Sequence, residues 1–210
     1  MPAPPENLPA PSALPARGQF RGSALYHSVA HFTEKYGPAT AHTVIARLPR
    51  TMRGFVQPNA PALGILGARS YPYPFVGELV RTMRDVVHAP DEDRFVQEIT
   101  YAGLEVLVNT MHRVLLRWLV SPAAFLERRQ EIWELFHTEG RLNVLSQTKT
   151  SYVIEDVDWT NTDPIVCKVN LEGRRRMLEL MGLTEIEARR EKCRAWGHDR
   201  CLTRFKWVAR

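Results

Sequence analysis

The segment CRAWGHDRC, residues 193–201, decides how the C-terminal part of this 210-residue chain folds. It carries two of the chain's three cysteines, and Gly197 stands between them, where glycine permits a tight turn. A turn at this glycine reverses the chain and returns the sulfur of Cys201 towards that of Cys193. The segment therefore predicts a β-hairpin that holds two thiols close together.

The residues around this turn predict two hairpins with a helix between them. Strands are expected at about 185–195 and 200–209, and one face of the last strand carries Cys201, Thr203, Phe205 and Trp207. An earlier hairpin is expected within 142–159, where apolar and β-branched residues alternate. A helix over 163–181 connects the two hairpins, because it starts at an Asp-Pro pair and stops before a glycine.

The chain before residue 140 is expected to be mainly helical. Apolar residues recur at helical spacing in five segments, 23–36, 39–48, 75–88, 91–120 and 121–140. Prolines and glycines interrupt residues 51–74, which predicts an irregular connection. Residues 1–18, rich in Pro and Ala, are expected to form a disordered leader, which leaves 19–210 as a single domain. The order of elements predicts an α+β fold, with helices packed on one antiparallel sheet of about four strands and a C-terminal zinc-type hairpin.

The composition is that of an ordinary globular protein, with 44% hydrophobic and 24% charged residues. No apolar run approaches the roughly 20 residues that a membrane span needs. The N-terminus lacks the basic and apolar regions of a secretory signal, so we expect a cytoplasmic protein. In that compartment three thiols are expected to bind a metal or to be buried rather than to form disulfides.

The net charge of +5 is concentrated in the last third of the chain, including the run Arg174–Arg176. A basic face can attract nucleic acid. The segment also contains several glutamates, among them Glu172, Glu179 and Glu187, which can act as counter-charges. We therefore expect a solvated basic face and no nucleic-acid partner.

The three cysteines predict either a metal site or a buried thiol cluster. Cys167, Cys193 and Cys201 follow the spacing Cys-x25-Cys-x7-Cys, which lacks the paired Cys-x2-Cys of a zinc finger. Zinc prefers about four thiolate, imidazole or carboxylate ligands, and Glu191 and His198 are the candidates for the fourth. The alternative is that the cysteines are small hydrophobic core residues. A catalytic thiol is disfavoured, because no base with an orienting partner accompanies the cysteines.

The segments around these cysteines resemble the C-terminal signature of the 4-vinyl reductase-like domain family. They are Pro164-Ile165-Val166-Cys167 and the run EKCRAWGHDRC, residues 191–201, at matching spacing. This family provides the sensory module of bacterial regulators that respond to phenols and other aromatics. Its fold is akin to the TRAPP-type trafficking subunits and is related to haem-NO-binding domains.

The resemblance implies a homodimer with a structural zinc ion held by Cys167, Cys193 and Cys201. The family's fourth ligand is a glutamate three residues before the second cysteine, and this chain has Arg190 there. Glu191, His198 or water would then complete the site.

The resemblance also implies a non-enzymatic sensory module that binds a small hydrophobic or aromatic ligand and acts by contacting another signalling protein. Trp133, Phe136, His137 and Tyr152 lie at the junction of helix and hairpin where such a ligand cavity would open. No nucleotide-binding glycine loop supports an enzyme.

Two alternatives remain open. The first is a dimeric adaptor without a small ligand, which a solid core would favour, whereas a sensor is expected to have an enclosed apolar cavity of roughly a few hundred cubic ångströms. The second is a haem or gas sensor, which needs an axial histidine. The candidates are His27, His31, His42, His88, His112 and His137, and because none lies in a recognisable haem motif, haem is not expected.

Overall fold

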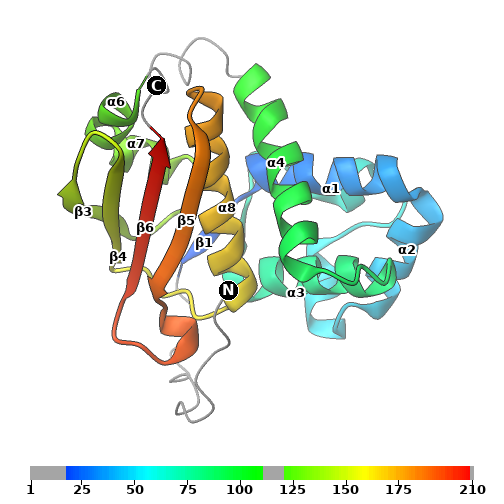
Figure 1. Cartoon of the computed structure of the whole chain (residues 1–210). Helices are drawn as coiled ribbons and strands as arrows, with labels where there is room; N and C mark the ends of the chain where they lie inside the picture. The colour runs from blue at the N-terminus through cyan, green and yellow to red at the C-terminus, as the bar shows by residue number, and fades with distance from the viewer. Residues whose placement is uncertain (1–17, 111–120, 209–210) are drawn as a thin grey trace.

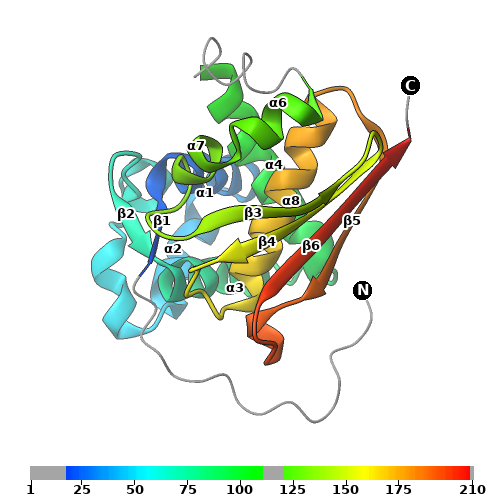
Figure 2. The same ribbon diagram turned by 90° about the vertical axis from the view of Figure 1, so that its left-hand side faces the viewer.

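A computed structural model describes residues 18–110 and 121–208 as a layer of helices on one face of a four-stranded antiparallel sheet (Figure 1). The strands lie in the order β3-β4-β6-β5, with β3 at Arg141–Gln147, β4 at Ser151–Val157, β5 at Thr184–Lys192 and β6 at Cys201–Val208. Figure 2 shows the sheet from its β3 edge, with the helices on one side. The predicted α+β class and the four-stranded sheet are confirmed.

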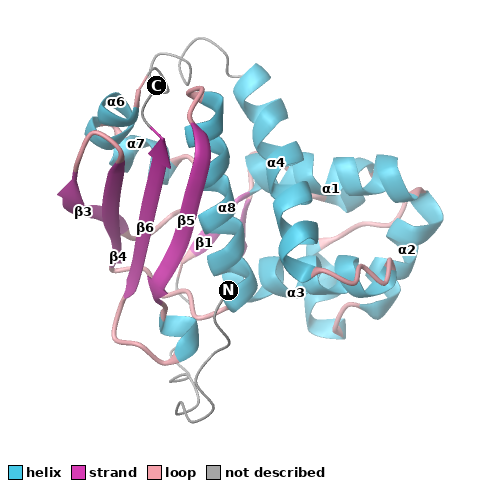
Figure 3. Ribbon diagram, in the orientation of Figure 1, coloured by secondary structure: helices cyan, strands magenta, loops and turns pink. Residues whose placement is uncertain are grey.

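The helix α8 (Pro164–Leu180) lies directly against the sheet and carries the next layer of helices on its other side (Figure 3). That layer contains α1 (Gly22–Tyr36), α3 (Tyr73–Val86) and α4 (Glu92–Thr110), with α2 (Pro38–Arg47) packed outside it. Both the hairpin-helix-hairpin order and the helical first half are therefore as predicted.

The helix starts follow from capping side chains. Asp163 accepts a hydrogen bond from the Ile165 amide at 2.9 Å, and Pro164 follows at the first helical position of α8. Ser121 accepts one from the Ala124 amide at 3.2 Å and starts α6 (Pro122–Glu127). The helix predicted over 121–140 is interrupted at Arg128, and α7 (Arg129–Glu134) ends well before Gly140.

One further prediction is revised by the structure. The irregular connection 51–74 contains two short 3₁₀ helices, η1 (Arg50–Phe55) and η2 (Pro61–Gly64). It ends in β2 (Ser70–Pro72), which pairs with β1 (Gln19–Arg21) in a second small sheet. Strands of three residues show too little alternation to be recognised from sequence.

Some predictions fall outside the described residues. The helix predicted over 91–120 is α4 as far as Thr110, and residues 111–120, which include His112, lie outside the described ranges. The predicted leader lies almost wholly within residues 1–17, which are also outside them. In the part of the chain that the structure covers, no helix combines the length and apolar character that crossing a membrane requires.

The face of the sheet that meets α8 contributes to the core. Cys201, Thr203, Phe205 and Trp207 of β6 are all buried, as their shared face predicts. The pairing of β5 with β6 is irregular near its end, where Arg190 pairs with Thr203 and Lys192 with Leu202. One residue, Glu191, is therefore extra on the β5 side, which is a β-bulge.

Candidate functional site

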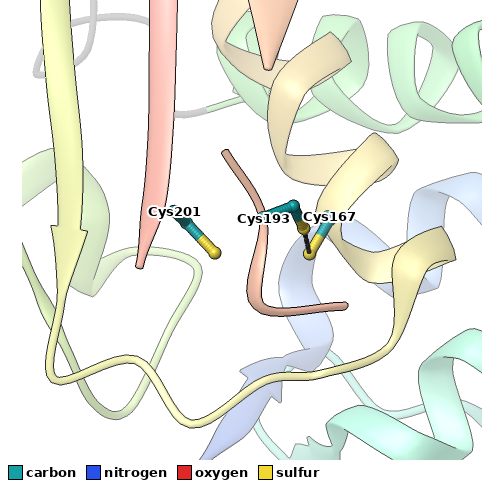
Figure 4. A group of neighbouring side chains, drawn as sticks. All are labelled: Cys167, Cys193 and Cys201. Carbon is teal, nitrogen blue, oxygen red and sulfur yellow. Dashed lines mark hydrogen bonds between the residues drawn. The ribbon is translucent and has the colours of Figure 1, made fainter. Parts of the chain in front are cut away.

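Three elements bring the cysteines together in the core. Cys167 lies in the first turn of α8, Cys193 follows β5, and Cys201 begins β6 (Figure 4). Their sulfurs lie within 4.8 Å of one another, and the Cys193 thiol donates a hydrogen bond to the Cys167 sulfur at 3.3 Å. Each cysteine is at most 5% exposed, and all three are reduced. The cluster is the one that the sequence predicts.

Local hydrogen bonds orient these sulfurs. The side-chain amide of Asn161 donates to the Cys167 sulfur at 3.2 Å, and the backbone amide of Arg194 donates to the Cys201 sulfur at 3.3 Å. Hydrogen bonding from Cys167 and Cys193 lowers the pKa of the Cys201 thiol, and the charge of Arg190 adds to this effect. Hydrogen bonding and burial raise the pKa of Cys167. Cys201 is therefore the thiol of the cluster that loses its proton most readily.

Arg190 occupies the side of the cluster where a fourth ligand is expected. Its guanidinium is 5% exposed, lies 2.5 Å from the Asp156 carboxylate and donates to the Cys167 carbonyl at 3.2 Å. A guanidinium has only donors, so it cannot ligate a cation. The cluster consequently offers three sulfur ligands and an adjacent positive charge.

The structure does not bring Glu191 or His198 to the sulfurs. In a regular strand Glu191 would share a face with Cys193, but as the extra residue of the bulge it points outwards and pairs with Arg204 at 2.5 Å. His198 lies in the turn, where its backbone amide donates to the Cys193 carbonyl at 3.2 Å. Among the described residues, the ligand cluster contains only the three cysteines. Three thiolates of this kind suit a thiophilic cation such as Zn²⁺.

A second feature is a cavity of about 70 Å³ between the helices and the sheet. Its walls come from β1, α1, α3, α4, α6, α7, α8 and β3 and are mainly apolar. Trp133, Phe136 and His137 line it as predicted, whereas Tyr152 does not. Tyr152 packs instead against Phe125, Phe205 and Trp207.

His137 is fixed at one wall of this cavity. It is 2% exposed and stacks on Trp133 with ring centroids 3.8 Å apart. The Asn170 amide donates to Nε2 at 3.0 Å, so Nδ1 carries the ring proton and donates it to the Tyr73 hydroxyl at 3.0 Å. Burial, with a smaller contribution from Arg174, holds the pKa of His137 well below its ordinary value. The imidazole is therefore neutral, and both of its nitrogens are engaged.

Arg174 is the charged group of the cavity. It is 4% exposed, its Nη2 lies 2.5 Å from the Asp156 carboxylate, and its guanidinium lies 5.4 Å from the centre of the Trp133 ring. Its Nη1 has no hydrogen-bond partner, and neither does Oγ1 of Thr100, another residue that lines the cavity. Two unpaired polar atoms thus belong to residues of a largely apolar wall.

The charges at Arg174 and Arg190 correct the sequence-based expectation of a solvated basic face. Both side chains are buried and share one carboxylate, Asp156, which is 1% exposed. The sequence does carry a signal for these buried ion pairs, because Asp156 continues the inward alternation of Tyr152 and Ile154 along β4. An acid on an inward face requires a buried cation.

Comparisons with known proteins show which fold the chain has, but they do not assign it to a protein family. No protein-family model and no curated protein matches the chain. Solved structures that resemble it include H-NOX (haem-NO/oxygen binding) proteins. The K. algicida protein superposes with a TM-score of 0.67 at 11% identity, covering 90% of this chain and 97% of that one.

Two other H-NOX proteins agree with this. A variant of the S. oneidensis protein gives a TM-score of 0.66 at 10% identity, covering 90% of this chain and 96% of that one. A variant of the T. tengcongensis protein gives a TM-score of 0.56 at 12% identity, covering 90% of this chain and 98% of that one. The expected relation to the haem-NO-binding fold is confirmed, and the resemblance to the 4-vinyl reductase-like family stays a prediction.

Proposed function

We propose that the chain is a non-enzymatic sensory module, in which a small molecule occupies the cavity at Arg174 and a zinc ion held by the three cysteines stabilises the sheet. The cavity carries this proposal. Its wall combines buried apolar side chains with unpaired polar atoms of Arg174 and Thr100, as expected for a ligand site. The H-NOX-like fold, typical of non-catalytic sensors, supports it.

The fold likeness by itself favours the haem or gas sensor among the predicted alternatives, since two of the similar structures concern the distortion of a bound haem. The residues of this chain do not fit that group. Of the described histidines only His137 lines the cavity, and neither of its nitrogens is free to ligate iron. The cavity of about 70 Å³ is roughly half the ~150 Å³ that admits benzene, so it does not admit a porphyrin.

An absorption spectrum tests whether this chain binds haem, as the fold suggests, or does not, as its residues indicate. Protein purified from cells supplied with a haem precursor is expected to show no Soret band. A Soret band that His137→Ala abolishes would restore the haem hypothesis and contradict our assignment of the cavity.

The adaptor alternative stays open, because the cavity of about 70 Å³ is smaller than the roughly few hundred cubic ångströms expected of a sensor's ligand cavity. The unpaired polar atoms among the residues of its wall are what favour the sensor. The homodimer, the signalling partner and the cytoplasmic location expected from the sequence remain part of the same proposal.

Gly173 provides a matched pair of variants for testing the sensory proposal. It lines the cavity, and a Cβ built on it would meet only Thr100 Cγ2, at 3.8 Å. Gly173→Ala therefore fits without blocking the cavity, whereas Gly173→Leu fills it. A library of small neutral and charged fragments is tested by ligand-observed NMR. We expect binders that recognise wild type and Gly173→Ala and are lost in Gly173→Leu. The absence of any fragment that distinguishes the two variants would contradict the proposal.

A further inference from the structure

We infer that a patch of four arginines around α2 and η1 binds an acidic segment of a partner protein. The arginine patch consists of Arg47, Arg50, Arg53 and Arg69, and none of these residues lines the cavity. The inference rests on the proposed function, because it names the kind of partner that the sensory module would contact. It follows from the distribution of charge along the chain, from the contacts that gather the four side chains, and from the apolar residues beside them.

The segment that holds the arginine patch has no acidic residue. Between Glu34 and Glu78 the sequence contains neither Asp nor Glu, although it contains all four arginines of the patch. Most described arginines elsewhere are paired with carboxylates, as Arg81 is with Asp163. In the described part of the chain, no carboxylate forms an ion pair with an arginine of the patch. The patch therefore holds four positive charges without a counter-charge, against a net charge of +5 for the whole protein.

Local contacts gather three of these side chains at the C-terminal end of α2. Arg47 is the last residue of α2, and Arg50 is the first residue of η1. The guanidinium of Arg53 donates to the carbonyls of Leu48 at 2.9 Å and Ala46 at 2.6 Å, which places it beside Arg47. Side chains three residues apart eclipse one another on a 3₁₀ helix, so Arg50 lies on the same side of η1 as Arg53. All three arginines are exposed and form one cluster of positive charge.

Arg69 extends the patch towards the other end of η1. Its guanidinium lies 5.3 Å from the centre of the ring of Phe55, the last residue of η1, and 5.4 Å from that of Tyr71. Such stacking holds the cation in place and leaves its charge unneutralised. The Arg69 side chain is exposed, like those of the other three arginines. The patch thus follows a helical segment of six residues, which is about 12 Å long.

The contacts within the fold do not account for Arg47 and Arg50. In the described chain neither side chain has a hydrogen-bond, ion-pair or ring partner. Like charges held close together repel one another, and an acidic partner would replace this repulsion by attraction. A guanidinium binds a carboxylate through two parallel hydrogen bonds, which makes arginine better suited than lysine to this role.

The surface beside the patch has the composition of a protein interface. Leu66 is 59% exposed and lies in the same turn as Arg69, whose amide donates to the Leu66 carbonyl at 3.1 Å. Met52 and Phe55 of η1 are half-buried. Protein interfaces are enriched in Arg, Met and aromatic residues and depleted in Lys and Glu. The patch and these three neighbours contain neither lysine nor glutamate.

The same features favour a protein over a membrane or a nucleic acid. Leu66 alone offers little apolar area for insertion into lipid, on which membrane binding depends. Four cations contact few phosphates of a duplex, and affinity for nucleic acid grows with the number of phosphates contacted. In Figure 1, α2 lies at the end of the helical layer that is far from the sheet, so the partner would bind away from the cysteine cluster.

Two synthetic peptides test the inference. One consists of three Glu-Ser-Glu-Leu repeats, and the other has glutamine in place of each glutamate. Alternate side chains of an extended peptide lie about 6.6 Å apart, close to the ~6 Å between Arg50 and Arg53 along η1. Fluorescence anisotropy should show that wild type binds the glutamate peptide about 10-fold or more tightly at ~50 mM salt. The ratio should approach one at ~1 M salt, because salt screens exposed charges.

Paired substitutions locate the binding site. The double variant Arg47→Gln/Arg50→Gln removes two charges without breaking a described contact. It should weaken binding of the glutamate peptide about fivefold or more and leave the glutamine peptide unaffected. Arg94→Gln/Arg189→Gln is the matched control, because it changes the net charge equally at exposed arginines that lie in acidic segments. The control should change the affinity less than about twofold.

Three outcomes would overturn the inference. The first is equal binding of the two peptides by wild type. The second is an equal loss of affinity in the two double variants, which would trace binding to net charge instead of the patch. The third is tighter binding of phosphatidylserine vesicles or a DNA duplex than of the glutamate peptide, lost in Arg47→Gln/Arg50→Gln. None of these measurements involves the cavity, so their failure and the failure of the Gly173 test are distinguishable.

Discussion

Asp156 is the residue whose replacement should disturb the interior most. It is 1% exposed, and each of its carboxylate oxygens receives one guanidinium, from Arg174 and from Arg190. Neutralising it leaves two cations in the core without an anion. Breaking a buried ion pair by removing one partner costs much more than the pair contributes when intact.

Asp156→Asn should therefore lower the free energy of unfolding by about 3–5 kcal/mol. Urea denaturation measures the change. Asp158→Asn is the matched control, because Asp158 is exposed and its ion pair is with the exposed Arg141. This substitution should lower the free energy of unfolding by less than about 1 kcal/mol. Similar effects of the two substitutions would show that the Asp156 pairs are not central to stability.

His137 should make the fold sensitive to mild acid. Burial keeps its pKa well below the ordinary value in the folded protein, whereas the unfolded chain binds a proton near pH 6.5. Below that pH the unfolded state holds more protons, so stability falls as the pH decreases, by up to about 1.4 kcal/mol per pH unit. The loss begins near the unfolded pKa and continues down to the folded one.

His137→Gln is expected to flatten this dependence between about pH 6.5 and 5, whatever its effect at neutral pH. The measurement is a series of urea melts of wild type and variant across that range. His42→Gln replaces an exposed histidine and should keep the wild-type slope. An unchanged slope in His137→Gln would rule out this residue as the origin of the acid sensitivity.

At the level of elements, β5 and its bulge decide which side chains face the cysteine cluster. Arg190 faces inwards by the alternation that it shares with Ile186, the extra residue Glu191 faces outwards, and the bulge returns Cys193 to the inward face. The strand therefore contributes a cation beside the sulfurs and a carboxylate to the surface. The three sulfurs belong to α8, to the segment after β5, and to β6. A metal bound there would tie the helix to the sheet at one point.

We expect wild-type protein purified without chelator to contain about one zinc per chain, and Cys193→Ser to lose it. Inductively coupled plasma mass spectrometry measures the metal, and chelator should lower the melting temperature of wild type but not that of Cys193→Ser. Glu191→Gln and His198→Asn serve as controls and should retain zinc, because neither side chain reaches the sulfurs. Loss of zinc in either control would mean that the hairpin rearranges around the metal.

Elements with a long regular pattern could be predicted from the sequence, and local irregularities could not. The alternation of β6 and the caps of α8 predicted those elements closely. The turn at Gly197 predicted that Cys193 and Cys201 approach each other, and the family resemblance added Cys167 to the cluster. The bulge at Glu191 and the break at Arg128 each shift the pattern by a single residue, for which the sequence carries no signal. The pairing of Arg174 and Arg190 through Asp156 depends on contacts between α8, β5 and β4, which no local pattern encodes.

At the scale of the whole molecule, the cavity and the cysteine cluster lie on the same side of the sheet. Arg174 faces the cavity and Arg190 lies beside the sulfurs, and α8 contributes residues to both sites. This arrangement differs from a haem pocket with an open axial position, although the surrounding fold is of the H-NOX type. The architecture is thus compatible with several ligand chemistries, and the side chains of this chain select one of them.

We expect the single carboxylate between the two arginines to couple the proposed ligand cavity to the proposed metal site. Any redistribution of Asp156 towards one guanidinium is at the expense of the other. By reciprocity, the factor by which bound metal changes the affinity of a cavity ligand must equal the factor by which that ligand changes the metal affinity. We expect that factor to be about fivefold or more, from titrations of each ligand with the other present and absent, and to approach one in Asp156→Asn. A factor of one in wild type would mean that the sites share a residue without communicating. A larger factor would make Asp156 the group through which occupancy of the cavity is reported to the cysteine end of the sheet.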